Sequence, residues 1–170
     1  MPTPNADNLR IGVCEVFMGG ESLGHTKGGV MLTNELETTD ITADKTGSTP
    51  LDVVVTGEQW RIRVPLAEEQ ITALQRAFPT STEAGGKLTF GRDAGLSLKT
   101  KAAALRLHPL RNGTSYSEDW YFHSVVRGGS VELNFEVDNQ QVKEVELRAL
   151  LDEDKSAGAQ LGGWGDSVVS

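Results

Sequence analysis

The sequence has few of the residues that enzymes and secreted proteins depend on. Its 170 residues include a single cysteine, Cys14, so no disulfide can form within the chain. No apolar run approaches the roughly 18 residues of a membrane span, and the N-terminus lacks the basic and then apolar order of a signal peptide. We therefore expect a soluble chain made in the cytoplasm, with one domain as the default for this length.

Positive charge is also scarce. The chain has 16 Lys and Arg against 24 Asp and Glu, a formal net charge of −8 and an isoelectric point near 4.9. A protein that holds nucleic acid by its phosphates needs a basic surface, so this composition argues against that class. It is compatible with a protein past which DNA must move without binding.

Residues arranged for catalysis or metal binding are missing as well. His25, His108 and His123 fall in different predicted elements without ligand spacing. Cys14 lies in an apolar strand, as a packed thiol would. The glycines around Lys27 precede a strand rather than a helix, which indicates a hairpin turn and not a phosphate loop. We predict no catalytic residue, no metal site and no cofactor, and therefore no enzyme.

The chain is organised around the stretch Ile41–Leu66. A turn-rich loop containing Gly47 and Pro50 leads into a long strand. The strand alternates apolar and basic residues in its second half, whereas its first half is apolar on both faces, so a bulge is expected at Gly57, where the pattern changes. A strand of this length exceeds what a small sandwich needs. It predicts a hairpin that leaves the domain and pairs with something else.

The rest of the pattern is mainly β. Strands are predicted at 9–18, 30–39, 96–99, 104–110 and 120–126, with a last hairpin at 131–149 and a loop at 80–95. The one convincing helix is predicted at about Glu68–Phe78. We expect an antiparallel β-sandwich or barrel with this helix and a long protruding hairpin. Residues 1–8 are predicted to be a flexible arm, 9–151 the β domain and 152–170 a C-terminal tail.

The last predicted hairpin gathers carboxylates on the face away from its core. They are Glu132, Glu136, Asp138, Glu144 and Glu146, against the single Arg148. Like charges opposite each other across a strand pair are destabilising. Either the face is simply solvated or it is a surface that repels polyanions, and both interpretations stay open.

Several short segments follow one another in an order and spacing that match a known family. They are VFMGGESLGHTKGGV (16–30), ITAD (41–44), GSTPLD (47–52), GE (57–58), VPLAE (64–68), LRLHPL (105–110), EDW (118–120) and the hairpin 131–151. Together they span most of the chain from Val16 to Leu151. In these segments the chain resembles the bacteriophage tail tube (major tail) proteins.

The resemblance implies a structural protein of the virion. Six subunits would form a ring whose sheets line a channel, rings would stack into a tail tube, and DNA would pass through the lumen during ejection. The implied partners are further copies of the chain and, in the tail, sheath, tape-measure, tail terminator and baseplate proteins. DNA would pass without specific binding, and no membrane partner is implied.

The resemblance also implies roles for particular residues. The hairpin loop would reach a neighbouring subunit or ring through Asp44, Lys45, Thr46, Gly47, Thr49, Pro50 and Asp52. Since an acidic lumen would keep DNA off its wall, we expect one of two acidic sets to face the channel. These sets are Glu35 with Glu37, and Glu132 with Glu136, Glu144 and Glu146.

Other functions stay open at this stage. A tail terminator, which forms a single ring, or a secretion-system tube protein would share the assembly class. A stand-alone β-sandwich binding module would instead need a concave aromatic patch, and the sequence makes no such patch evident.

Overall fold

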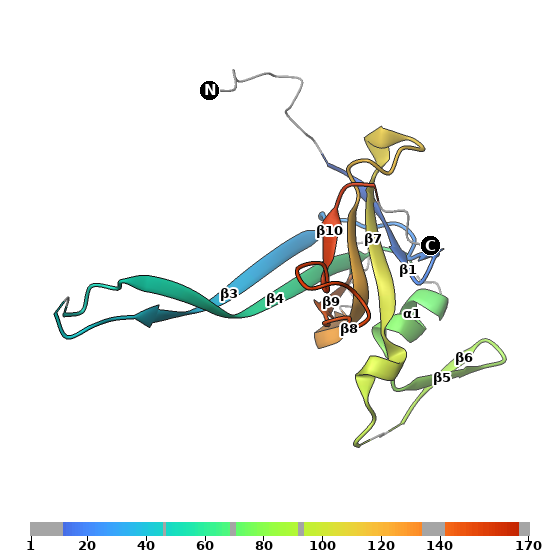
Figure 1. Ribbon diagram of the computed structural model, residues 1–170. Helices are drawn as coiled ribbons and strands as arrows, with labels where there is room; N and C mark the ends of the chain where they lie inside the picture. Colours follow the sequence, from blue (N-terminus) through green and yellow to red (C-terminus); the bar gives the residue numbers. More distant parts are fainter. Residues whose placement is uncertain (1–11, 46, 69–70, 92–93, 134–141, 167–170) are drawn as a thin grey trace.

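The computed structural model describes residues 12–45, 47–68, 71–91, 94–133 and 142–166 (Figure 1). Strands account for 51% of the residues and helices for 9%, which confirms the mainly β class with one α-helix. The elements are β1 Cys14–Met18, β2 Glu21–Ser22, β3 Met31–Ile41, β4 Asp52–Leu66, α1 Ile71–Ala77, β5 Ser81–Ala84, β6 Lys87–Phe90, η2 Leu98–Lys101, β7 Ala103–Pro109, η3 Leu110–Asn112, β8 Trp120–Leu133, β9 Lys143–Ala149 and β10 Gly162–Trp164.

Eight of the strands form one antiparallel sheet in the order β2-β1-β7-β8-β9-β4-β3, and β10 pairs with β8. The sheet curls, because the segment after β2 returns to the side of β4. There the amide of Lys27 donates to the carbonyl of Pro65 over 3.1 Å, and the amide of Ala67 donates to the carbonyl of His25 over 2.8 Å. These hydrogen bonds place the segment after β2, at one end of the strand order, beside β4 near the other end, so that the sheet encloses one core.

The core lies on the inner face of this curled sheet. Ile62, Val64 and Leu66 of β4 are buried, and β9 alternates buried and more exposed residues along its length. This alternation follows from the pleat, which turns successive side chains to opposite faces. Helix α1 packs against the same core through Ala77. Each large aliphatic side chain buried here stabilises the fold by roughly 1.5–3 kcal/mol.

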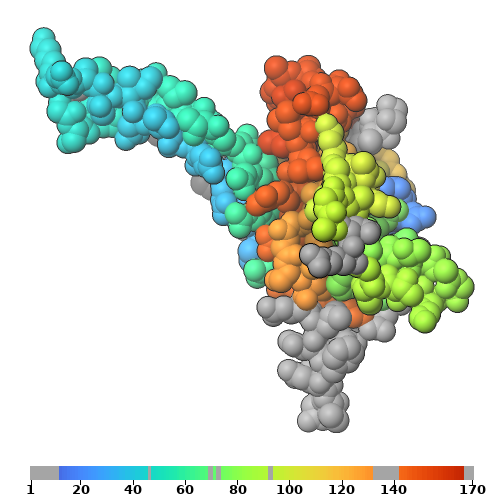
Figure 2. Space-filling model, turned by 90° about the horizontal axis from the view of Figure 1, so that it is seen from below, coloured from blue at the N-terminus to red at the C-terminus, as the bar shows by residue number. Residues whose placement is uncertain are grey.

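The β3–β4 hairpin runs out of this domain as a long two-stranded ribbon (Figures 1 and 2). It pairs continuously from Met31 opposite Arg63 to Ile41 opposite Asp52. The register shifts where Glu37 is opposite Gly57 and Thr38 is opposite Val55, which confirms the bulge expected at Gly57. We call residues 33–58 the arm. All of its described residues are exposed except the half-buried Gly57.

The single helix is shorter than the sequence predicted. It runs from Ile71 to Ala77 rather than from about Glu68 to Phe78. The carboxylate of Glu68 accepts a hydrogen bond from the amide of His25 over 3.1 Å, so this residue is tied to the turn before β3. Residues 69–70 lie outside the described part of the chain.

Two predictions for the middle of the chain are wrong. The expected loop at 80–95 contains the β5–β6 hairpin, which turns at Gly85 and Gly86 with φ angles of 62° and 75°. Two successive positive φ angles suit a tight hairpin turn, and the Gly-Gly pair was its sequence signal. The expected strand at 96–99 is instead the 3-10 helix η2, closed by a hydrogen bond from the Thr100 hydroxyl to the Ser97 carbonyl.

The ends of the chain meet the predictions in part. The predicted strand 9–18 is described from Cys14 as β1, while residues 1–11 lie outside the described part. The predicted last hairpin forms from β8 and β9, and residues 134–141 between these strands also lie outside the described part. The predicted tail contributes β10, whose Gly162 is opposite Phe122 of β8.

Candidate functional site

The arm exposes apolar side chains on both of its faces. Beyond the bulge, Val53 and Val55 lie on one face and Val54 on the other, with exposed fractions of 51%, 55% and 43%. Leu36, Ile41 and Leu51 add further exposed apolar area. A ribbon that only faced solvent would carry mostly polar side chains. The arm instead exposes valines on both faces, which is the composition of a surface that another chain covers.

The residues predicted for the contact loop lie together at the far end of the arm. Ile41 accepts a hydrogen bond from the Leu51 amide over 2.8 Å, which closes the loop. Gly47 has a φ of 63°, which a residue with a side chain rarely adopts. Asp44, Lys45, Thr49, Pro50 and Asp52 are exposed there. Thr46 lies outside the described residues.

The described members of the two predicted acidic sets lie on one face of the sheet. The registers place Glu35 opposite Gln59, Arg63 opposite Glu146 and Pro65 opposite Glu144, and these β4 residues share the outward face. In register, Glu132 lies opposite Glu144. Glu136 and Asp138 lie outside the described residues. The sequence could not show that the two sets are continuous, because their adjacency depends on the pairing of β4 with β9.

This outward face is mixed in charge rather than purely acidic. Strand β4 contributes Arg61 and Arg63, which the prediction of carboxylates against one Arg148 left out. A guanidinium nitrogen of Arg61 lies 3.0 Å from a carboxylate oxygen of Glu35, and Arg63 lies 3.7 Å from Glu144. These pairs are about half exposed, so each contributes little to stability. The acidic character of the face is therefore partly neutralised.

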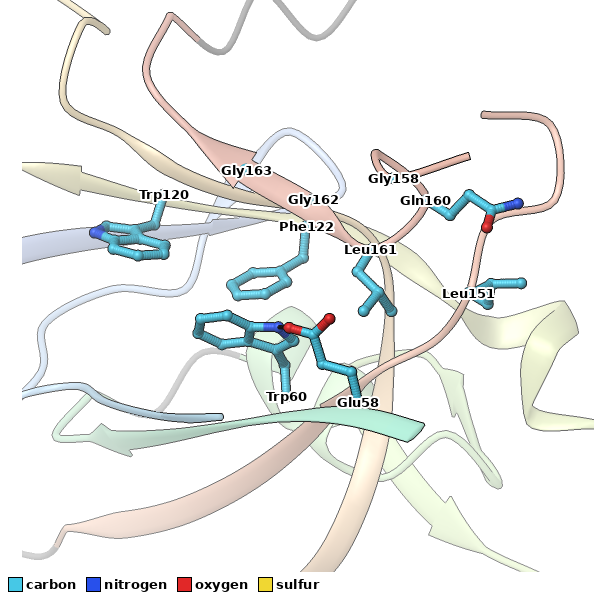
Figure 3. Close-up of a pocket in the computed structure, with 10 residues that line it drawn as sticks. All are labelled: Glu58, Trp60, Trp120, Phe122, Leu151, Gly158, Gln160, Leu161, Gly162 and Gly163. Carbon is cyan, nitrogen blue, oxygen red and sulfur yellow. Dashed lines mark hydrogen bonds between the residues drawn. The ribbon is translucent and has the colours of Figure 1, made fainter. Parts of the chain in front are cut away.

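A pocket with aromatic walls opens where the arm joins the domain (Figure 3). Trp60 of β4 contacts both Trp120 and Phe122 of β8, with ring centroids 5.9 and 5.6 Å away. The pocket has a volume of about 360 Å³ and is closed on one side by Leu161, Gly162 and Gly163. Trp120 is 37% exposed, so part of the aromatic wall is open to solvent. No aromatic patch was evident in the sequence, and the structure corrects that judgement.

One carboxylate marks the polar side of this pocket. Glu58 Oε1 accepts hydrogen bonds from Trp60 Nε1 and from Asn34 Nδ2, each over 2.8 Å. Trp60 and Glu58 share a face of β4 because they are two residues apart. Alternation in the sequence carried that signal, whereas the approach of Trp120 depends on a strand register that the sequence does not reveal.

A buried charged cluster joins β7 to the loop before β8. His108 Nδ1 lies 2.7 Å from Asp119 Oδ1, and His108 Nε2 lies 2.9 Å from the Gly113 carbonyl oxygen. Arg106 Nε lies 3.6 Å from the other Asp119 oxygen. Burial acts to lower the pKa of His108, but the hydrogen bonds to Asp119 and Gly113 outweigh it and raise that pKa. Since both ring nitrogens face acceptors, the cluster favours the charged form of His108.

Cys14 is half-buried in β1, and burial raises the pKa of its thiol above the ordinary value, so it is a weak nucleophile.

Within the described ranges, no group of three or more His, Cys, Asp and Glu side chains is placed to hold a metal ion. The same part of the chain has no helix that combines the length and apolar character needed to cross a membrane. Comparison with models of known protein families and with curated proteins finds no match to this chain.

Proposed function

We propose that the chain is a structural subunit of a bacteriophage tail tube, which assembles as stacked six-membered rings around a channel for DNA. The arm carries this proposal. It is a long antiparallel ribbon with exposed valines on both faces, and β3 is an edge strand of the sheet. An edge strand offers a row of main-chain donors and acceptors to another chain. Both features suit a subunit that is completed by its neighbours.

The charge of the chain supports a conduit for DNA. At −8 for each copy, a ring of six copies would carry a formal charge of −48. Such a ring would not release counterions from DNA and would not hold it. The family resemblance in the segments from Val16 to Leu151 adds a second, independent support. Sheath, tape-measure, terminator and baseplate proteins are the partners that this function would bring.

The first test is negative-stain electron microscopy of the purified chain over a series of concentrations, with sedimentation velocity in parallel. We expect hollow tubes or stacked sixfold rings. A variant whose residues 42–51 are replaced by a two-residue turn should retain the fold and lose the tubes. Single rings at every concentration would favour a tail terminator instead, and monomers at every concentration would contradict the assembly class.

The aromatic pocket favours one alternative, a stand-alone binding module. Tryptophan faces beside a carboxylate suit a small ligand with apolar and hydrogen-bonding or cationic parts. This function requires a monomer in which the pocket is occupied by ligand. If rings form and the fluorescence of Trp60 and Trp120 changes on assembly, the pocket belongs to the interface between copies, and the alternative is contradicted.

A further inference from the structure

The arm of one copy and the opposite end of the domain differ sharply in charge. The arm, residues 33–58, holds six acidic residues and one basic residue. At the opposite end, residues 71–101 hold five basic and two acidic residues, although the chain as a whole is acidic. In Figures 1 and 2 the arm and the β5–β6 hairpin project from opposite sides of the domain. A chain with unlike charge at its two ends is suited to head-to-tail association.

The basic end has free lysines and exposed apolar surface. Arg76 is paired with Glu21 at 3.3 Å and Lys99 with Glu153 at 3.2 Å. In the part of the chain that the structure describes, Lys87 and Lys101 have no carboxylate within ion-pair distance. On the same end Phe90 is 67% exposed, with one edge against Phe78.

A hollow beside α1 gives this end a place for an apolar side chain. Its volume is about 270 Å³, and it is lined by Met18 and Pro79 together with the polar residues Glu21, Gln75, Arg76, Ser81 and Lys101. The arm offers both apolar and acidic side chains to such a mixed lining, because each of its valines is flanked in the hairpin by acidic or small polar residues. Asp40, for example, lies opposite Val53.

Charge also argues against the simplest alternative, in which two arms pair with each other. Both edges of the arm are free, because β4 pairs with β9 only from Arg61 to Leu66. Strand β3 carries Glu35, Glu37 and Asp40, the arm's part of β4 carries Asp52 and Glu58, and neither edge has a basic residue. Two such edges side by side would place carboxylates opposite carboxylates, which destabilises a strand pair. The partner that the arm fits is therefore a surface with lysines, and the chain has one on its far side.

From these observations we infer that the arm of one copy docks on the basic end of a second copy, the surface formed by Arg76, Lys87, Phe90, Lys99 and Lys101. The inference rests on the proposed self-assembly and adds the surface that receives the arm. The contact is head to tail, since it joins different surfaces on the two copies. Repeated contacts of this kind close into a ring when the rotation between copies allows it.

Mixed cross-linking tests the contact directly, because Cys14 is the single cysteine of the chain. A Val53→Cys chain and a Phe90→Cys chain of different tag length are mixed and treated with a short bismaleimide. We expect a mixed dimer as the main product. Val53→Cys with Leu110→Cys is the matched control, since Leu110 is 55% exposed and lies outside the basic end. A dimer of two Val53→Cys chains in greater yield than the mixed dimer would overturn the inference in favour of arm pairing.

Charge exchange supplies the second test. We expect Glu37→Lys with Asp40→Lys to weaken assembly at least tenfold, and Lys87→Glu with Lys101→Glu to do the same. An equal mixture of the two variants should restore an arm-to-end contact, seen as discrete dimers in sedimentation. Lys155→Glu, a charge reversal on an exposed residue outside both surfaces, should leave assembly unchanged.

The outcomes separate this inference from the proposed function. If the wild-type chain forms no rings or tubes, the proposed function fails. If it forms them and neither charge pair affects their assembly, or the mixture recovers no contact, the function stands and the docking surface is wrong.

Discussion

His108 and Asp119 form a buried ion pair, 2.7 Å apart, that joins β7 to the loop before β8. The Asp119 side chain is fully buried, and the second nitrogen of His108 is bound to the Gly113 carbonyl. Near the pair, the Arg106 guanidinium stacks on the rings of Phe17 and Tyr116, with centroid distances of 4.7 and 4.6 Å. The fold therefore favours the charged form of His108.

This pair predicts a dependence of stability on pH. The folded state raises the pKa of His108 above its ordinary value of 6.5. The stabilisation is therefore complete below pH 6.5 and is lost as the pH rises through the folded-state pKa. We expect His108→Gln to lower the free energy of unfolding by roughly 1.5–3 kcal/mol at low pH, because a hydrogen bond to a charged group is lost. The deficit relative to wild type should shrink at higher pH.

Urea unfolding of both chains between pH 5.5 and pH 9 measures this difference. His25→Gln is the matched control, since the side chain of His25 is exposed. Its deficit should be near zero throughout. A deficit of His108→Gln that stays constant over the range would show that the pair contributes by packing rather than by charge.

Gly162 predicts how β10 is held against β8. A Cβ at this position would lie 2.1 Å from the carbonyl oxygen of Tyr121, a backbone atom that cannot move aside easily. We expect Gly162→Ala to detach β10, lower the free energy of unfolding by roughly 1–3 kcal/mol, and increase the exposure of Trp120. Acrylamide quenching of tryptophan fluorescence and urea unfolding measure the two effects.

Gly91→Ala is the control for this substitution. No atom lies within 4 Å of a Cβ built on Gly91, and its φ is not in the left-handed region. If acrylamide quenches the tryptophan fluorescence of both alanine variants equally, and both have the same free energy of unfolding, the close approach of β10 to β8 is not a constraint on the fold.

The sequence predicted those parts of the fold that depend on local alternation. The arm could be predicted because Val53, Val54 and Val55 interrupt the alternation of apolar and polar residues, which resumes over residues 60–64. The bulge at Gly57 followed from the same change. The β5–β6 hairpin was missed because its strands are only four residues each, too short for alternation to be distinguished from a loop, although Gly85-Gly86 indicated the turn.

The site was predicted less completely, because it depends on which strands are neighbours. The loop residues around Gly47 are adjacent in sequence and therefore lie together. The aromatic pocket needs Trp60 of β4 and Trp120 of β8 to meet across strands far apart in the chain. Likewise, Arg63 lies opposite Glu146 and near Glu144 only through the β4–β9 pairing. No local pattern carries that information.

The exposed valines of the arm predict a separation between stability and assembly. Val53→Thr with Val55→Thr removes apolar area from one face of the arm and keeps the β-branched shape that strands favour. Surface substitutions of this kind change stability within about 0.5 kcal/mol, so the unfolding midpoint should stay as in wild type. Assembly should weaken by tenfold or more, measured as the concentration at which rings appear in sedimentation velocity.

Ile62→Ala is the contrasting variant, because Ile62 is fully buried in the core. It should lower the free energy of unfolding by roughly 2–5 kcal/mol through the cavity it leaves. If the arm variant unfolds like wild type and also assembles like wild type, the valines are not part of a subunit contact.

The outward face of β9 predicts how an assembled tube meets DNA. Glu144→Lys with Glu146→Lys would place two lysines in line with Arg148 on that strand, beside Arg61 and Arg63 of β4, and so create a continuous basic surface. If this face lines the channel, ejection of DNA through tubes of normal length should slow, because phosphates would now be held by the wall. Ejection rates from particles built with the variant, measured together with tube length, test this.

Glu83→Lys with Asp154→Lys makes the same charge change on exposed residues of other elements. It should leave ejection unchanged, since its lysines add no charge to the outward face. Equal slowing by both variants would mean that net charge rather than this face governs the effect, and normal ejection with Glu144→Lys and Glu146→Lys would remove the face from the channel wall.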